Sequence, residues 1–220
     1  MKQELNSVVG QIQMKIQEIP LGEPFTPSAL SHLGTRANIH QVLSRMTKAG
    51  QIDRITHGVY VKPRTSKYVQ KVSPGAEKIA QAVVAGSNQV MSISGAEAAR
   101  RFGLSTQMST QYVFLTSGSS RVLKIRNMAI QLRHTSARWL TLAGHPAGEA
   151  LVALRYLGRD LVTTQTIAKI EKGLTPEEFK LLKSPSCMPP AWLNDVIYKY
   201  EREKELALQA EELDKLRPKN

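Results

Sequence analysis

The apolar positions of residues 35–49 recur at the spacing of one face of a helix. Thr35 is a typical N-cap, because its hydroxyl can accept from a free amide of the first turn. Ala49-Gly50 is a typical stop, with Lys48 placed favourably near the negative end of the helix dipole. We therefore expect a helix over residues 35–49 with an apolar stripe of Ile39, Val42, Leu43 and Met46.

The next residues predict a two-stranded hairpin. Residues 52–56 and 59–62 are short strand candidates, and His57-Gly58 lies between them as a turn. The alternation in the first strand is imperfect, since each of its sides carries one isoleucine. The hairpin is nevertheless expected to follow the helix directly.

Two further helices precede this segment. Residues 2–19 carry an apolar stripe, and Pro20-Leu21-Gly22 ends it. Thr26-Pro27 opens a short second helix with threonine as the cap, and Gly34 stops it. Three helices and a hairpin within roughly 65 residues have the size and order of a winged helix-turn-helix.

Ser73-Pro74 marks the expected start of a second, mixed region. Its patterns predict a helix over 74–84, a strand over 90–93, and a helix opened by a capping box at Ser94-Gly95-Ala96-Glu97. Three strands and then four helices are expected to follow, over 112–116, 122–126 and 128–134, and over 146–157, 163–172, from Thr175 and from Pro189-Pro190.

These elements predict an α+β protein with two domains. The first, residues 1–72, is expected to be a winged helix-turn-helix domain that binds DNA. The second, residues 73–220, is expected to be a mixed α/β domain with a small antiparallel sheet and a helical C-terminal part. Residues 201–220 are mostly charged, which is typical of a solvated helical tail, with a dimer contact as the alternative.

The amino-acid composition further limits the class of protein that the chain can be. Hydrophobic residues make up 41% of the chain, enough for a packed core, and the one cysteine, Cys187, excludes an internal disulfide framework. The sequence has neither an apolar run of bilayer length nor a signal-peptide pattern, so a cytoplasmic location is expected.

The positive charge lies in the first two thirds of the chain. The formal net charge is +12, of which residues 1–72 and 73–145 carry +6 each and residues 146–220 carry none. Such a distribution favours a polyanionic partner, whereas a general solubility surplus would not be expected to vanish in one third of the chain.

The predicted helix and hairpin carry the side chains that a DNA-binding head needs. Arginine reads guanine and asparagine or glutamine reads adenine in the major groove, while basic hairpin residues suit phosphates. The alternative is a polar helix face that is exposed to solvent and binds nothing. The candidate DNA-binding residues are Arg36, Asn38, Gln41, Arg45, Lys48, Arg54, His57, Lys62, Arg64 and Lys67.

A second basic patch follows in residues 100–138. It could hold DNA phosphates, RNA or an acidic protein, or it could be a solvated sheet edge protected from aggregation. Its members are Arg100, Arg101, Arg121, Lys124, Arg126, Arg133 and Arg138.

The sequence does not predict an enzyme. Metal-dependent nucleases need clustered carboxylates, and residues 73–145 hold only Glu77 and Glu97. The histidines show no metal-ligand spacing with one another or with Cys187. The loop Thr116–Arg121 resembles a phosphate-binding loop in composition but lacks its lysine and following helix, so a turn between strands explains it as well. No catalytic residue, metal or cofactor is expected.

Several ordered motifs resemble a known family. The wing ITHGVYVKP resembles the N-terminal unit of AbiEi-type antitoxins, and the later stretches SISGAEAARRFGLSTQMSTQYVFLTSGSSR, IQLRHTSARWLTLAGHPAGEALVALRYLG and IEKGLTPEEF resemble its second domain. The resemblance covers about residues 12–182. The segment after Lys183 has no counterpart in that pattern.

The resemblance implies an antitoxin of a type IV toxin–antitoxin pair, a class linked to abortive infection in phage defence. Its first domain would bind inverted repeats in double-stranded operator DNA and repress its own operon, with two copies on DNA as monomers or a weak dimer. Its second domain would counter a nucleotidyltransferase-like toxin, with or without a stable complex. Arg100, Arg101, Arg121 and Arg133 would then be the residues to test for antitoxicity.

Three other functions stay open at this point. A stand-alone winged-helix transcription regulator with a partner- or ligand-sensing C-terminal domain would share the same head. A nucleic-acid-processing enzyme could use that head for targeting, although the missing carboxylate clusters argue against it. An antitoxin that binds RNA would use the second basic patch.

Overall fold

The chain forms two compact units, and neither is a continuous segment. The computed structural model describes residues 7–64, 72–126 and 128–216. Unit 1 comprises residues 1–91 and 111–135, and unit 2 comprises residues 92–110 and 136–220. This division differs from the boundary expected at residues 72/73, because the chain passes into unit 2, returns to unit 1 and leaves it again.

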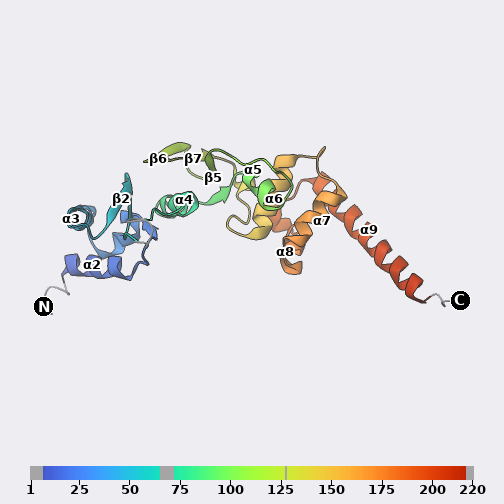
Figure 1. The fold of residues 1–220 in the computed structure, drawn as a ribbon, viewed down its shortest axis with the longest axis horizontal. Coiled ribbons are helices and arrows are strands. Elements are labelled where there is room, and N and C mark those ends of the chain that lie inside the picture. Colours follow the sequence, from blue (N-terminus) through green and yellow to red (C-terminus); the bar gives the residue numbers. More distant parts are fainter. Residues whose placement is uncertain (1–6, 65–71, 127, 217–220) are drawn as a thin grey trace. The chain divides into compact units, whose positions relative to one another are not determined.

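The first half of unit 1, in which Figure 1 labels α2, α3 and β2, is built on the apolar stripes that the sequence predicts. Ile12 and Ile16 from the first helix pack with Ile39 and Leu43 from the third, and all four are buried. The elements are α2 (Val8–Glu18), β1 (Pro24–Phe25), the 3₁₀ helix η1 (Pro27–Leu33), α3 (Arg36–Lys48), β2 (Asp53–Thr56) and β3 (Val59–Val61).

Two details of this half differ from the sequence-based expectation. The short second helix is a 3₁₀ helix, η1, and Thr26 makes no side-chain capping bond to it. A further strand, β1, pairs with β3, so the hairpin belongs to a three-stranded antiparallel sheet in the order β1-β3-β2. A two-residue strand shows no alternation, and so it left no pattern in the sequence.

The second half of unit 1 holds one helix and a sheet. The elements are α4 (Ala76–Ala85), β5 (Tyr112–Thr116), β6 (Arg121–Ile125) and β7 (Met128–His134). The sheet order is β4-β5-β7-β6, and β4 (Met91–Ile93) lies where the chain passes from unit 1 into unit 2. The hairpin predicted for β6 and β7 is confirmed, since the two strands are antiparallel neighbours.

The expectation of a purely antiparallel sheet is wrong, because β5 lies beside β7 and runs parallel to it. Residues 117–120 carry the chain past β7 to the outer strand β6. Gly118 permits this crossing, since a Cβ there would lie 2.1 Å from the side-chain amide of Gln89. The loop is further tied to β7, because the amide of His134 donates to Ser120 Oγ at 2.8 Å.

Apart from Ser92 and Ile93 of strand β4, the regular elements in the described residues of unit 2 are helices. Its buried centre includes Leu151, Leu154, Ile167, Ile170 and Leu193. The elements are α5 (Gly95–Arg101), the 3₁₀ helices η2 (Ala137–Trp139) and η3 (Pro185–Cys187), α6 (Pro146–Leu157), α7 (Thr164–Lys172), α8 (Pro176–Leu181) and α9 (Ala191–Leu216).

Local capping signals place most of these helices. Thr175 and Glu178 form the predicted reciprocal capping box at the start of α8. The box predicted at Ser94 is only half formed: Ser94 accepts from the amide of Glu97, but the Glu97 carboxylate binds arginines. The predicted solvated tail is a helix as far as Leu216 (Figure 1). Residues 202–215 of this helix, α9, are exposed.

Together the elements confirm the predicted α+β class, with helices and two small sheets. Within the described ranges, no helix combines the length and the apolar character that crossing a membrane would require.

Candidate nucleic-acid interface

Helix α3 presents a polar face that is fixed by a buried apolar face. Thr35 Oγ1 accepts from the amide of Asn38 at 3.3 Å, which confirms the predicted cap. Ile39, Val42, Leu43 and Met46 are each at most 3% exposed, so the helix cannot rotate about its axis without losing its core contacts. The outer face is therefore presented in a defined orientation.

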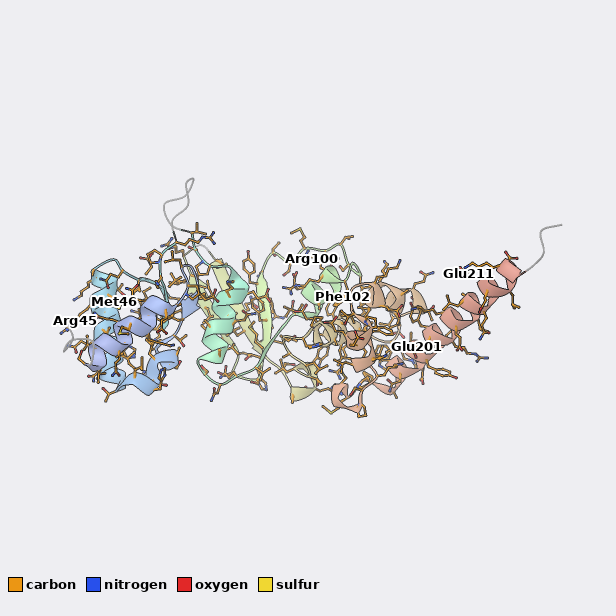
Figure 2. The ribbon with its side chains drawn as sticks, turned by 90° about the horizontal axis from the view of Figure 1, so that it is seen from below. Arg45, Met46, Arg100, Phe102, Glu201 and Glu211 are labelled. Atoms are coloured by element: carbon orange, nitrogen blue, oxygen red, sulfur yellow. The ribbon has the colours of Figure 1, made fainter. Side chains whose placement is uncertain are left out.

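The candidate residues on α3 are all exposed but do not form one row. Asn38, Gln41, Arg45 and Lys48 recur every three or four residues and share one side. Arg36 lies about half a turn away from Asn38 and pairs with His40, whose Nε2 is 3.5 Å from its Nε. Figure 2 labels the adjacent Arg45 and Met46, of which Arg45 is exposed and Met46 buried.

The hairpin β2–β3 places a second group of cations. Gly58 has a φ of +72°, a value that favours glycine, and it lets the chain reverse after His57. Arg54 Nη2 lies 2.9 Å from His57 Nδ1, and both side chains are exposed. The two residues thus make a small polar cluster at the end of the hairpin.

The other hairpin candidates have different surroundings. Lys62 donates through Nζ to the carbonyl of Gln17 at 2.7 Å, near the C-terminal end of α2, where a cation is favoured. Its charge thus already has a structural partner. Arg64 is exposed and pairs through its backbone with Val72, whereas Lys67 lies outside the described residues.

The hairpin end contacts the second sheet of the same unit. Thr56 Oγ1 donates to the backbone carbonyl of Lys124 on β6 at 3.0 Å. This contact joins residues 68 positions apart and brings Lys124 beside the hairpin. The sequence contains no signal for it, since the acceptor is a backbone carbonyl, which any residue at position 124 would provide.

The second basic patch does not form one group. Four of its seven residues belong to unit 1, and three belong to unit 2. Those of unit 1 are Arg121, Lys124, Arg126 and Arg133, and those of unit 2 are Arg100, Arg101 and Arg138.

Within unit 1, two of these arginines have uncharged partners. Arg121 donates through Nη2 to Gln89 Oε1 at 3.1 Å, and Arg133 donates through Nη2 to Gln131 Oε1 at 3.0 Å. Since these bonds leave the positive charge uncompensated, both arginines still contribute to the field of unit 1.

Within unit 2, Arg100 and Arg101 are paired with carboxylates. Arg100 makes a two-pronged contact with Glu97 at 2.7 and 2.8 Å, and Arg101 reaches both Glu97 and Glu149. The hydrogen bond from Arg100 is the main reason that the pKa of the Glu97 carboxyl is lowered. Arg100 is therefore paired within α5, and Arg101 also joins α5 to α6, so both are poorer candidates for a polyanion.

Cys187 of unit 2 is buried. Burial raises the pKa of the Cys187 thiol, which keeps it protonated and unreactive. Across the described residues, no group of three histidine, cysteine, aspartate or glutamate side chains is arranged to hold a metal ion.

Comparison with known protein families gives a match over most of the chain. The family described as "Family of unknown function (DUF6088)" matches residues 11–182, which is more than half of the chain. No curated protein matches the chain. No solved structure matches it either.

Proposed function

We propose that this protein, which belongs to the DUF6088 family, is a DNA-binding repressor and the antitoxin of a type IV toxin–antitoxin pair. The observation that carries the DNA-binding part is the polar row on α3, held outward by a buried apolar face and followed directly by a basic hairpin. Such a head binds operator DNA by placing α3 in the major groove.

The order of elements supports a winged helix-turn-helix in residues 8–61. The elements follow one another as helix α2, strand β1, short helix η1, helix α3 and hairpin β2–β3. The strand order β1-β3-β2 is the one that this architecture uses. In this assignment η1 and α3 are the two helices of the motif, α3 is the recognition helix and β2–β3 is the wing.

The geometry suggests distinct tasks for the candidate residues. Gln41 and Arg45 lie mid-helix on the exposed row and are proposed to read base edges. Lys48, Arg54 and His57 are proposed to contact phosphates, which orient the head without reading sequence. Lys62 is proposed to act in the fold, because its amine already binds a carbonyl of α2.

The test of DNA binding uses the promoter that precedes the protein's own gene. Fluorescence anisotropy would measure binding of the full chain to that promoter and to a shuffled duplex. Arg45→Ala should weaken binding to the promoter about tenfold or more, since one base contact contributes about 1–3 kcal/mol. Arg159→Ala removes the same charge from an exposed position of unit 2 and should leave binding unchanged. Equal losses in both variants would contradict the assignment.

The antitoxin part rests on the resemblance of residues 12–182 to AbiEi-type antitoxins. It is tested by expressing the gene next to this one with and without the full chain, and by scoring growth. The neighbour alone should arrest growth, and co-expression should restore it. Rescue by the Arg45→Ala chain would separate antitoxicity from DNA binding, whereas a harmless neighbour would remove the antitoxin assignment and leave the repressor.

A further inference from the structure

Unit 1 contains a cavity of about 950 Å³, and His57 is the one residue that its described lining shares with the residues proposed above to contact DNA. Its walls come from η1, the first turns of α3, the end of the hairpin, the last turn of α4 and strand β6. All of these belong to unit 1. The volume lies in the range of about 300–1,000 Å³ that is usual for small-molecule sites.

The cavity is shaped by close approaches at its rim. Gly86, at the end of α4, lies against η1, and a Cβ there would be 2.3 Å from Thr26 Oγ1 and 2.7 Å from Ser28 Oγ. On the opposite side, the Thr56 hydroxyl bonds to the Lys124 carbonyl at 3.0 Å. Any side chain at position 86 would disturb the first of these contacts.

The lining combines an apolar surface with cations. Ile39 and Val59 are buried at its base, and Val83, Val122 and Leu123 extend the apolar part. Basic side chains line the cavity from three elements. They are Arg36 and His40 of α3, His57 of the hairpin, and Arg121 and Lys124 of β6.

The charge of this lining is unbalanced. None of the described residues that line the cavity is an aspartate or a glutamate, so the cations meet no carboxylate within it. Serine and threonine hydroxyls, among them Ser28, Ser31 and Ser87, add hydrogen-bond donors. The arrangement is complementary to a negative group attached to an apolar body.

From this chemistry we propose that the cavity binds a small organic anion, a carboxylate, sulfonate or phosphate ester on an apolar body. The negative group would lie among Arg36, His57 and Lys124, and the body would lie on Val59, Val83 and Val122. Such a ligand would replace the missing carboxylate and exclude water from the apolar wall.

The cavity and the proposed DNA surface use different sides of α3. Arg36, Ile39 and His40 face the cavity, whereas Gln41 and Arg45 belong to the exposed row. A ligand in the cavity would touch α3 and the hairpin at once, and it would leave the exposed row of α3 uncovered. The ligand proposal does not depend on DNA binding.

The test uses the full chain and anilinonaphthalene sulfonate, a fluorescent aryl sulfonate of the proposed chemistry. Titration should show saturable binding to one site. Val122→Trp, which places an indole in the cavity from a position 56% exposed, should weaken binding tenfold or more. Val90→Trp makes the same change at a position 48% exposed and outside the cavity, and should bind as the unchanged protein does.

A second pair of variants tests the negative group. Lys124→Gln should weaken binding severalfold, whereas Lys180→Gln, at an exposed position of unit 2, should not. Equal binding by Val122→Trp and Val90→Trp would overturn the proposal, as would the absence of saturable binding. Loss in Val122→Trp without any loss in Lys124→Gln would overturn the anionic part, since an apolar cavity alone would explain it. Thermal unfolding of each variant shows whether the fold is kept.

Discussion

At the scale of single residues, Arg155 is the cation whose role is most structural. Its guanidinium donates to the backbone carbonyls of Arg138, Cys187 and Met188, and so ties α6 to both 3₁₀ segments of unit 2. Burial lowers the pKa of Arg155, but the group stays charged at neutral pH because an arginine begins so high.

Replacing this residue should destabilise the protein. Arg155→Met keeps the side-chain length but leaves three carbonyls without their donor, so the free energy of unfolding should fall by about 2–4 kcal/mol. Urea unfolding followed by circular dichroism measures the change. Arg159→Met, at an exposed position just after the end of α6, is the matched control and should change it by less than about 0.5 kcal/mol. Equal losses would show that the three bonds contribute little.

Residue identity alone did not distinguish such roles. The sequence indicates Lys62 as a phosphate contact, yet in the structure its amine donates to a carbonyl of α2. The sequence also indicates Arg100 as part of a basic patch, yet in the structure the charge of Arg100 is paired with Glu97. Arg45 and Gln41 could be selected because helical spacing fixes which side of α3 they occupy. The direction of a long basic side chain depends on neighbours distant in sequence, and periodicity contains no information on those.

At the scale of elements, α9 is attached to α7 by a small polar network. Tyr200 Oη donates to Glu171 Oε2 at 2.6 Å, and Lys204 Nζ lies 2.8 Å from both oxygens of the same carboxylate. Burial, followed by the bond to Glu171, raises the pKa of Tyr200 to about 12. An unfolded tyrosine titrates near about 10.

This network makes the stability of unit 2 depend on alkaline pH. The folded tyrosine keeps its proton more strongly than the unfolded one, so its contribution is complete below about pH 10 and is lost as the pH rises toward about 12. Tyr200→Phe should lower the free energy of unfolding by about 1 kcal/mol at pH 8. The difference from the unchanged protein should shrink between about pH 10 and 12, measured by urea unfolding at each pH.

Tyr198 supplies the control for that prediction, because it lies on the same helix and is 69% exposed. Tyr198→Phe should leave both the stability and its pH dependence unchanged. If the two variants behaved alike, the bond between Tyr200 and Glu171 would have no measurable effect.

Elements with local signals were predictable, and elements defined by distant pairing were not. The cap at Thr35, the hairpin turn at Gly58 and the capping box at Thr175 are encoded within a few residues, so their positions were predicted correctly. Strand β1 and the parallel pairing of β5 with β7 depend on chain segments that approach from elsewhere. No short window of sequence specifies those approaches.

At the scale of the whole chain, the excess positive charge belongs to one unit. Unit 1 holds 15 lysines and arginines against 5 acidic residues, so it carries +10 of the formal net charge of +12. The linear sequence placed half of that charge in a separate second domain. The chain's return at residues 111–135 brings Arg121, Lys124, Arg126 and Arg133 into the same unit as the predicted head.

This concentration of charge predicts a steep dependence of operator affinity on salt. Each phosphate contact releases about one counterion, so the logarithm of the binding constant should fall linearly with the logarithm of salt concentration. Arg54→Gln should make the slope shallower by about 1, because one phosphate contact is lost. Arg126→Gln should also make the slope shallower, because Arg126 directly follows β6, and the bond from Thr56 to Lys124 joins β6 to the hairpin.

The control for the salt series comes from unit 2, whose net charge is only +2. Arg159→Gln and Lys180→Gln remove equal charges from exposed positions there and should leave the slope unchanged. A slope that fell equally in all four variants would mean that affinity follows total charge rather than local contacts. A flat salt profile in the unchanged protein would show that the charge of unit 1 is not used on DNA, and the base-reading role of α3 would lose its support.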